Sequence, residues 1–255
     1  MPSRTYLSTT DPTASGFKAA KERITLLFCS NASGDKQLKP LLLHRAMKPR
    51  AMKKVDFNKL PVHWRSNPKA WVTKQIFQDW FENLFVPEVK EYLEGKGLEF
   101  KALLIVDNAP GHSILDHPQV KVVFLPPNTT SLIQPLDQGI ISTFKKPYVK
   151  LSFKFILDIL DSDPSLTVTE AWKRFSIRDC VNHIGSALAA MQMSTLNACW
   201  KPLWPECVHH KSQQNVDDRE IILLAHAVGG EGFNDMTVEE VGEMMEDAVV
   251  DDEEL

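Results

Sequence analysis

The chain has 255 residues, with 29 Lys and Arg against 33 Asp and Glu, and a formal net charge of −4 at pH 7. This length fits one large domain or one domain with an appendage, and a hydrophobic fraction of 43% is enough for an ordinary core. No apolar run approaches the roughly 18 residues that a membrane span needs. The first residues also lack the apolar segment of a secretory signal. Composition therefore argues against membrane insertion and against secretion.

The cysteines and glycines exclude further classes of protein. The four cysteines have no CxxC spacing, which is typical of free thiols in a reducing compartment. A zinc site remains an alternative for Cys199 and Cys207 with His209 and His210, although their spacing matches none of the common zinc patterns. Glycine-rich phosphate-binding motifs are absent from the sequence, so we expect no nucleotide cofactor.

The two parts of the chain carry opposite charge. Residues 1–160 hold 23 Lys and Arg against 14 Asp and Glu, whereas residues 161–255 hold 6 against 19. The basic part is compatible with a polyanion-binding surface and equally with a solvated lysine-rich face. Residues 235–255 contain ten acids and no base, which predicts a solvated tail outside the core, with a helix around Val238–Met245.

The first half of the chain predicts strands followed by a helix. Ile24–Ser30 and Leu38–His44 are apolar segments separated by Asn31, Gly34 and Asp35, a pattern that predicts a β-hairpin. In residues 76–93, apolar residues recur at steps of three and four, which predicts an amphipathic helix bent or split at Pro87.

The second half predicts two strands and then helices. Ala102–Val106 and Lys121–Leu125 are continuous apolar runs, as expected of strands that are covered on both faces. Helical spacing resumes after Gly139, with an interruption at Pro147, and again over Glu170–Met191. This order of elements indicates a mixed α/β domain with a helical extension.

Two acids stand at places where chemistry is expected. Asp107 directly follows the first apolar run, and the carboxyl end of a buried strand is where α/β sheets build sites. Asp137 lies in the segment QPLDQG, just before a predicted helix. Each acid also has a structural explanation, since Asp107 fits an Asx-turn or helix N-cap and Asp137 fits an N-cap. If both lie at one sheet edge, they can share a hard cation such as Mg²⁺.

Weaker candidates surround these acids. Asn108 and His112 are possible neighbours of the Asp107 carboxylate, with Asn108 orienting the loop, and a histidine beside an acid is commonly its hydrogen-bond partner. The helix after Asp137 carries a stripe of basic residues that could follow a phosphate backbone: Lys145, Lys146, Lys150 and Lys154.

Three segments, taken in order along the chain, resemble the DDE superfamily endonuclease domain of pogo and Tigger-type transposases: ITLLFCSNASGDKQLKPLLLH, LLIVDNAPGH and FLPPNTTSLIQPLDQGIISTFK. That group includes jerky-like proteins and centromere protein B. Matching segments extend from Met1 to about Trp204. The resemblance implies an RNase H-like mixed sheet flanked by helices. It also implies Asp107 and Asp137 as catalytic acids that bind Mg²⁺ or Mn²⁺, DNA as partner, and residence in the nucleus. The oligomeric state stays open, with a homodimer as one alternative.

One departure from the family pattern concerns its first acid. In the family this acid lies on the first strand of the sheet, shortly before a segment similar to Met1–Tyr6. We therefore expect this sequence to lack that strand and its acid, together with the family's N-terminal helix-turn-helix region. Asp11 and Asp35 are poor substitutes, because each lies in a turn or loop rather than at the expected metal edge. The hairpin is then expected to expose unpaired backbone groups.

These observations predict three regions: an RNase H-like core over residues 1–155, a helical extension over 156–210, and an acidic flexible tail over 211–255. The leading functional hypothesis is a DNA-binding domain derived from a DDE transposase, with endonuclease and strand-transfer activity impaired by the missing acid. The alternative is a domesticated, non-catalytic DNA-binding or chromatin-associated protein. An inert fragment of a decaying transposon is a third interpretation.

Overall fold

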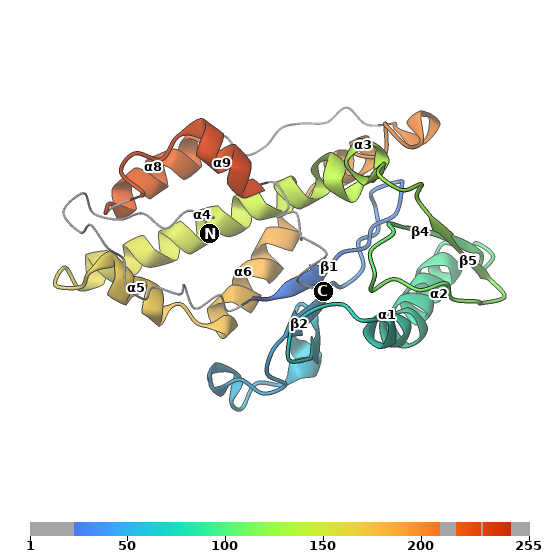
Figure 1. The fold of residues 1–255 in the computed structure, drawn as a ribbon, viewed down its shortest axis with the longest axis horizontal. Helices are drawn as coiled ribbons and strands as arrows, with labels where there is room; N and C mark the ends of the chain where they lie inside the picture. The colour runs from blue at the N-terminus through green and yellow to red at the C-terminus, as the bar shows by residue number, and fades with distance from the viewer. Residues whose placement is uncertain (1–22, 210–217, 231, 246–255) are drawn as a thin grey trace. The chain divides into compact units, whose positions relative to one another are not determined.

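The computed structural model describes residues 23–209, 218–230 and 232–245, so Asp11 and the segment Met1–Tyr6 lie outside the described residues. The chain forms two compact units. Within the described residues, we call residues 23–138 with 192–209 the strand unit, and residues 139–191, 218–230 and 232–245 the helical unit (Figure 1). These units cut across the three regions predicted from the sequence, because the helix after Gly139 packs with later helices.

The predicted β-hairpin is present in the strand unit. Strand β1 (Thr25–Leu27) pairs antiparallel with β2 (Leu41–His44), and β2 pairs on its other side with the parallel strand β3 (His63–Ser66). The connection from β2 to β3 contains two short helical turns, η1 (Arg50–Met52) and η2 (Phe57–Lys59). Within the described residues β1 is an edge strand.

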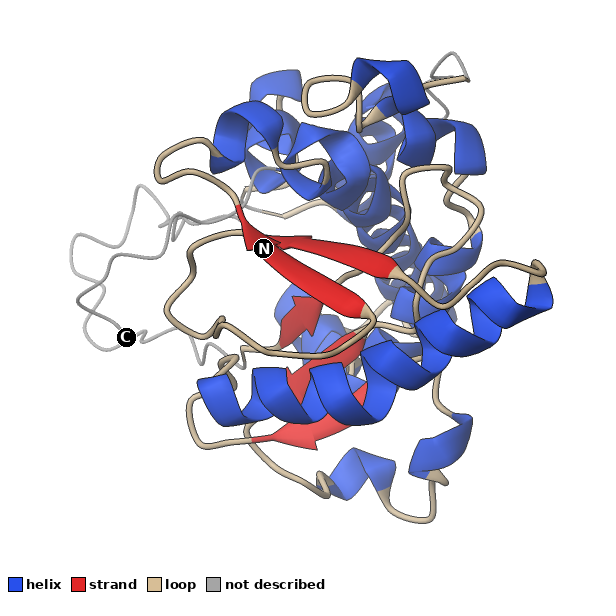
Figure 2. Cartoon of the chain, turned by 90° about the vertical axis from the view of Figure 1, so that its right-hand side faces the viewer, coloured by secondary structure: helices blue, strands red, loops and turns tan. Residues whose placement is uncertain are grey.

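The other two predicted strands form a second sheet. Strand β4 (Ala102–Val106) pairs in parallel with β5 (Val120–Phe124), and Figure 2 shows the strands in two groups. The expectation that β4 is covered on both faces is wrong at Leu103, which is 59% exposed. The fold is mixed α/β with small sheets, as expected of an RNase H-like domain.

The predicted amphipathic helix covers the core of the strand unit. It consists of α1 (Lys74–Trp80), a π-helical turn η3 (Phe81–Phe85) and α2 (Val86–Gly95). Pro87 is the second residue of α2, which directly follows the π-helical turn, and there the regular i to i−4 hydrogen-bond pattern is already interrupted. The helix buries its aromatic face against both sheets, through contacts of Phe77, Trp80, Phe81 and Phe85 with strand residues such as Leu41 and Leu104.

The helical unit is organised around one long helix. This is α4 (Ile141–Ser162), and it packs with α5 (Val168–Arg174), α6 (Ile177–Ala189), α8 (Asp218–Val228) and α9 (Val238–Met245) (Figure 1). The single helix predicted over Glu170–Met191 is two helices, because a capping box between Ser176 and Asp179 starts α6.

The acidic C-terminal segment departs from its predicted character. A helix forms at Val238–Met245 as the sequence indicates, but Val241 and Met245 are buried in the core of the helical unit. The expectation that this part lies outside a core is therefore wrong for the described residues. No helix in residues 23–209, 218–230 or 232–245 is long and apolar enough to cross a membrane.

Residues 192–209 return to the strand unit and support the hairpin turn. They form α7 (Met193–Ala198) and the turn η5 (Pro205–Cys207). The strand unit also contains the short helix α3 (Thr130–Ile133). Asn197 is fully buried, and its amide donates hydrogen bonds to the carbonyls of Ala32 and Cys207. The hairpin turn is thereby tied to a segment more than 160 residues away in the sequence.

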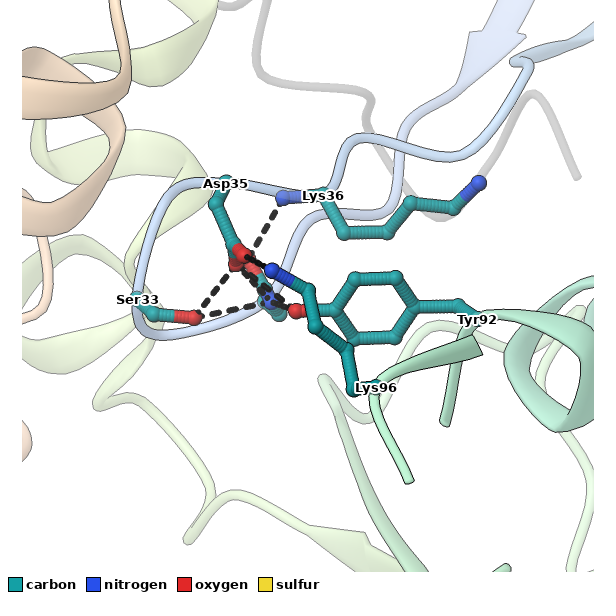
Figure 3. Close-up of polar contacts among 6 residues, drawn as sticks. Ser33, Asp35, Lys36, Tyr92 and Lys96 are labelled. Carbon is teal, nitrogen blue, oxygen red and sulfur yellow. Dashed lines mark hydrogen bonds and ion pairs between the residues drawn. The ribbon is translucent and has the colours of Figure 1, made fainter. Parts of the chain in front are cut away.

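Asp35 has a structural role at the same turn (Figure 3). Its carboxylate accepts hydrogen bonds from Asn31, Ser33 and the Tyr92 hydroxyl, and it forms an ion pair with Lys96 at 2.9 Å. The Asn31 and Lys96 hydrogen bonds hold the pKa of Asp35 well below its usual range. Asp35 thus fastens the hairpin turn to the end of α2.

Asp35→Asn is expected to destabilise the strand unit by about 1–2 kcal/mol at pH 7, because it removes a charged acceptor of several hydrogen bonds. A carboxyl group with a lowered folded-state pKa stabilises the fold above its unfolded pKa of about 3.9 and loses that effect as the pH falls below it. The stability difference between the two proteins, measured by urea unfolding, should therefore shrink below about pH 4. Asp116→Asn, a change in an exposed loop acid, is the matched control; an equal loss of stability in both variants would contradict the assigned role.

Candidate metal and nucleic-acid site

Asp107 lies at the carboxyl end of β4, directly after its last residue. Its Oδ1 is 2.6 Å from Nδ1 of His112 and accepts a hydrogen bond from the backbone amide of Ala109. Burial opposes ionisation of this carboxyl group, but the hydrogen bond and charge of His112 outweigh it, so the pKa of Asp107 lies below its ordinary value. Asp107 is therefore a carboxylate at neutral pH, and these two bonds do not engage Oδ2.

The residues between Asp107 and His112 hold this loop in place. The side-chain amide of Asn108 donates a hydrogen bond to the carbonyl of Leu125, which follows β5. A Cβ atom at Gly111 would lie 2.2 Å from the carbonyl oxygen of Val72, so only glycine fits this close approach without a shift of the backbone. The motif DNAPGH thus fixes the carboxylate at the ends of two parallel strands, where α/β sheets place ligand sites.

The side chain of His112 is itself fixed by packing against the core. Its ring is in contact with the ring of Phe77, with centroids 4.6 Å apart, and Phe77 is fully buried in the core. The side chain of His112 is only 12% exposed. The structure therefore brings together three of the candidates predicted from the sequence, Asp107, Asn108 and His112, in one loop.

Asp137 lies in a different setting. It belongs to the π-helical turn η4 (Leu136–Ile140), is exposed, and its backbone amide donates to the carbonyl of Gln134. Gly139 has a φ of 130° and interrupts the helical path between η4 and α4. The N-cap residue of α4 is Ile140, without a capping side chain, so the expected structural role of Asp137 as an N-cap is not present.

The described acids do not complete a metal site. Mg²⁺ prefers several oxygen ligands in near-octahedral geometry, and the ionised Asp107 is a suitable donor. However, residues 23–209, 218–230 and 232–245 contain no group of three or more His, Cys, Asp or Glu that could hold a metal ion. The same search finds no zinc site formed by the described residues Cys199, Cys207 and His209. His210, the fourth residue of that alternative, lies outside the described residues.

The predicted lysine stripe on α4 is largely engaged within the helical unit. Lys146 forms an ion pair with Asp218 at 2.6 Å, Lys150 pairs with Glu220 at 2.5 Å, and Lys145 donates to the carbonyl of Met245. Lys154 is exposed. The sequence analysis did not predict Asp218 and Glu220 as partners of these lysines. The opposite charges of the two parts of the chain are the sequence feature that indicates such pairing.

The sequence of this chain is similar to a described family and to several known proteins. Residues 21–200 match the family described as DDE superfamily endonuclease. The chain is 30% identical to the Jerky protein of Mus musculus over 230 residues, 86% of this chain and 39% of that protein. It is 31% identical to the Jerky protein homolog of Homo sapiens over 210 residues, 80% of this chain and 35% of that protein.

Tigger transposable element-derived protein 7 of Homo sapiens is 33% identical over 157 residues, 58% of this chain and 28% of that protein. This chain thus spans well under half the length of these relatives. No solved structure matches the chain.

Gly111→Ala is expected to destabilise the strand unit by about 1–3 kcal/mol or more, because the added methyl group collides with a backbone carbonyl rather than a movable side chain. Gly95→Ala is a matched control, since a Cβ there meets nothing within 4 Å and alanine favours the helix by up to about 1 kcal/mol. Urea unfolding followed by circular dichroism measures both changes. A neutral effect of Gly111→Ala would refute the close approach to Val72.

His112→Gln is expected to raise the pKa of Asp107, because the variant removes the hydrogen bond and charge that offset burial of the carboxyl group. Titration of the carboxyl carbon by NMR measures this pKa directly. An Asp107 pKa that is unchanged in the variant would show that His112 does not set the ionisation of the site.

Proposed function

Because the chain belongs to the DDE superfamily endonuclease family, in the pogo and Tigger group, we propose that it binds DNA as a transposase-derived domain. The observation that carries the proposal is the match of residues 21–200 to the DDE superfamily endonuclease family, a region that includes Asp107 at the carboxyl end of β4. The ends of parallel strands are where α/β folds place ligands. DNA is the partner that the resemblance implies.

We further propose that this polypeptide does not cut DNA by itself. Asp107 and Asp137 are the proposed positions of two metal-binding acids, with Mg²⁺ or Mn²⁺ as the ion, but two carboxylates are fewer than the three that the resemblance implies. A complete site of the kind that the resemblance implies requires one further acid.

The activity of a longer protein is a separate question, because the chain spans 39% and 35% of the two Jerky relatives. A domesticated, non-catalytic DNA-binding or chromatin-associated role fits the same observations, and under this proposal the protein resides in the nucleus and forms a homodimer. The ion pairs of Lys146 and Lys150 with α8 support a limited contribution of the α4 stripe to DNA contact.

We expect the chain to bind a DNA duplex with strong salt dependence and to leave supercoiled plasmid intact in Mg²⁺ or Mn²⁺. Asp107→Ala should change DNA affinity by less than about twofold, because a carboxylate makes no attractive contact with a phosphate. Fluorescence anisotropy and plasmid nicking measure the two properties, with Asp116→Ala as the control for an acid in an exposed loop.

Two results would overturn parts of this proposal. Metal-dependent nicking that disappears in Asp107→Ala but persists in Asp116→Ala would show a working nuclease. No binding at low salt would remove the DNA-binding function.

A further inference from the structure

The positive charge of the first part of the chain is concentrated in one segment. Residues 36–74 contain 11 Lys and Arg and one acid, whereas the remainder of residues 1–160 contains 12 Lys and Arg and 13 acids. The basic character of that part therefore comes from the surroundings of β2 and β3. The helix after Asp137 contributes less, with four Lys and one acid over residues 139–160.

Most of this charge lies in the connection between β2 and β3, which we call the basic loop (residues 45–59). Six cationic side chains of the loop are exposed: Arg45, Lys48, Arg50, Lys53, Lys54 and Lys59. None of the six forms an ion pair within the described part of the chain. The single acid of the loop, Asp56, accepts a hydrogen bond from the amide of Asn58 and caps η2.

The loop is attached to the core at several points. His44, buried at the end of β2, accepts a hydrogen bond from the amide of Ala46. Met52 is 2% exposed, and Phe57 contacts the ring of Trp64 with centroids 5.4 Å apart. Because the loop is attached at these points, less of its backbone has to be ordered when a ligand binds, which lowers the entropy cost of binding.

A cavity of about 550 Å³ lies beside the loop. No acid is among its lining residues, which include Lys39, Lys48, Phe57, Trp64 and Arg65. Arg65 is already paired with Asp79 at 2.7 Å. Lys39 and Lys48 form no ion pair within the described residues, so this edge of the cavity can accept a phosphate group.

The basic loop and the α4 stripe differ in how their charges are satisfied. Lys146 and Lys150 already have carboxylate partners in α8, so a phosphate would have to displace those partners. The loop cations face solvent, and binding of a phosphate there releases condensed counterions from DNA without breaking an internal ion pair.

We propose that the basic loop, with the adjoining cavity, is the main DNA-phosphate-binding surface of this chain. The inference rests on the proposed DNA-binding function and assigns it a location. The contacts are with the phosphate backbone, so they position DNA without reading its sequence. Duplex DNA is the occupant, since the surface is a broad array of cations rather than a row of exposed aromatic rings.

The test compares two variants of the full chain with the same net charge. The first carries Lys48→Gln, Arg50→Gln, Lys53→Gln and Lys59→Gln; it leaves Lys54 unchanged because that residue has a φ of 68°. The control carries Lys90→Gln, Lys101→Gln, Lys121→Gln and Lys173→Gln. Affinity for a duplex of about 20 base pairs is measured by fluorescence anisotropy between about 50 and 200 mM salt, and circular dichroism confirms that both variants fold.

The loop variant should lose at least about tenfold in affinity at low salt, and its salt slope should fall by about 3–4, close to one unit for each lost contact. The control variant should stay within about twofold of the unmodified chain. Equal losses in both variants would overturn the assignment to the loop while leaving the DNA-binding function intact. No binding by the unmodified chain would instead refute the proposed function, and a tenfold preference for duplex RNA would refute DNA as the occupant.

Discussion

The contact between the Asp107 carboxylate and the His112 ring is the one on which the candidate site depends. It links the carboxyl end of β4 to a histidine whose ring rests on the buried side chain of Phe77. The carboxylate is thus supported from the hydrophobic core by way of α1. Its position is further limited by Asn108, which reaches the end of β5, and by Gly111, which lies against Val72. A site held in this way keeps one acid ionised and oriented without any help from a ligand.

Charge is distributed so that the two units have different surfaces. The strand unit carries the exposed cations of the basic loop, whereas α8 of the helical unit places Asp218 and Glu220 on the lysines of α4. Surface ion pairs contribute little to stability. Their larger effect here is that they satisfy charges that would otherwise attract a polyanion, which leaves the loop between β2 and β3 as the stronger electrostatic site.

The sequence predicted local structure well where periodicity and turn chemistry agree. The hairpin, the strand Ala102–Val106 and the helix Val238–Met245 are all present. Prediction failed where tertiary packing decides the outcome. The helix Val238–Met245 buries one face, because Val241 and Met245 pack with α4 and α8 in a shared core. The break before α6 was missed because the capping box formed by Ser176 and Asp179 was not recognised.

The parts of the site that lie close together in the chain could be predicted from the sequence. Asp107, Asn108 and His112 are neighbours in the chain, so a strand followed by a turn is enough to place them together. The engagement of Lys146 by Asp218 joins residues 72 positions apart and requires knowledge of how α8 packs on α4. The requirement for glycine at position 111 likewise depends on Val72, which no local pattern reveals.

We propose that Asp107 and Asp137 do not by themselves form a complete metal site. Isothermal titration of the full chain with Mn²⁺ measures this directly. We expect binding of millimolar affinity or weaker, since Asp107 and Asp137 alone supply too few oxygen ligands. Micromolar binding of Mn²⁺ that is lost in Asp107→Ala would contradict the account and show that the chain assembles the whole site.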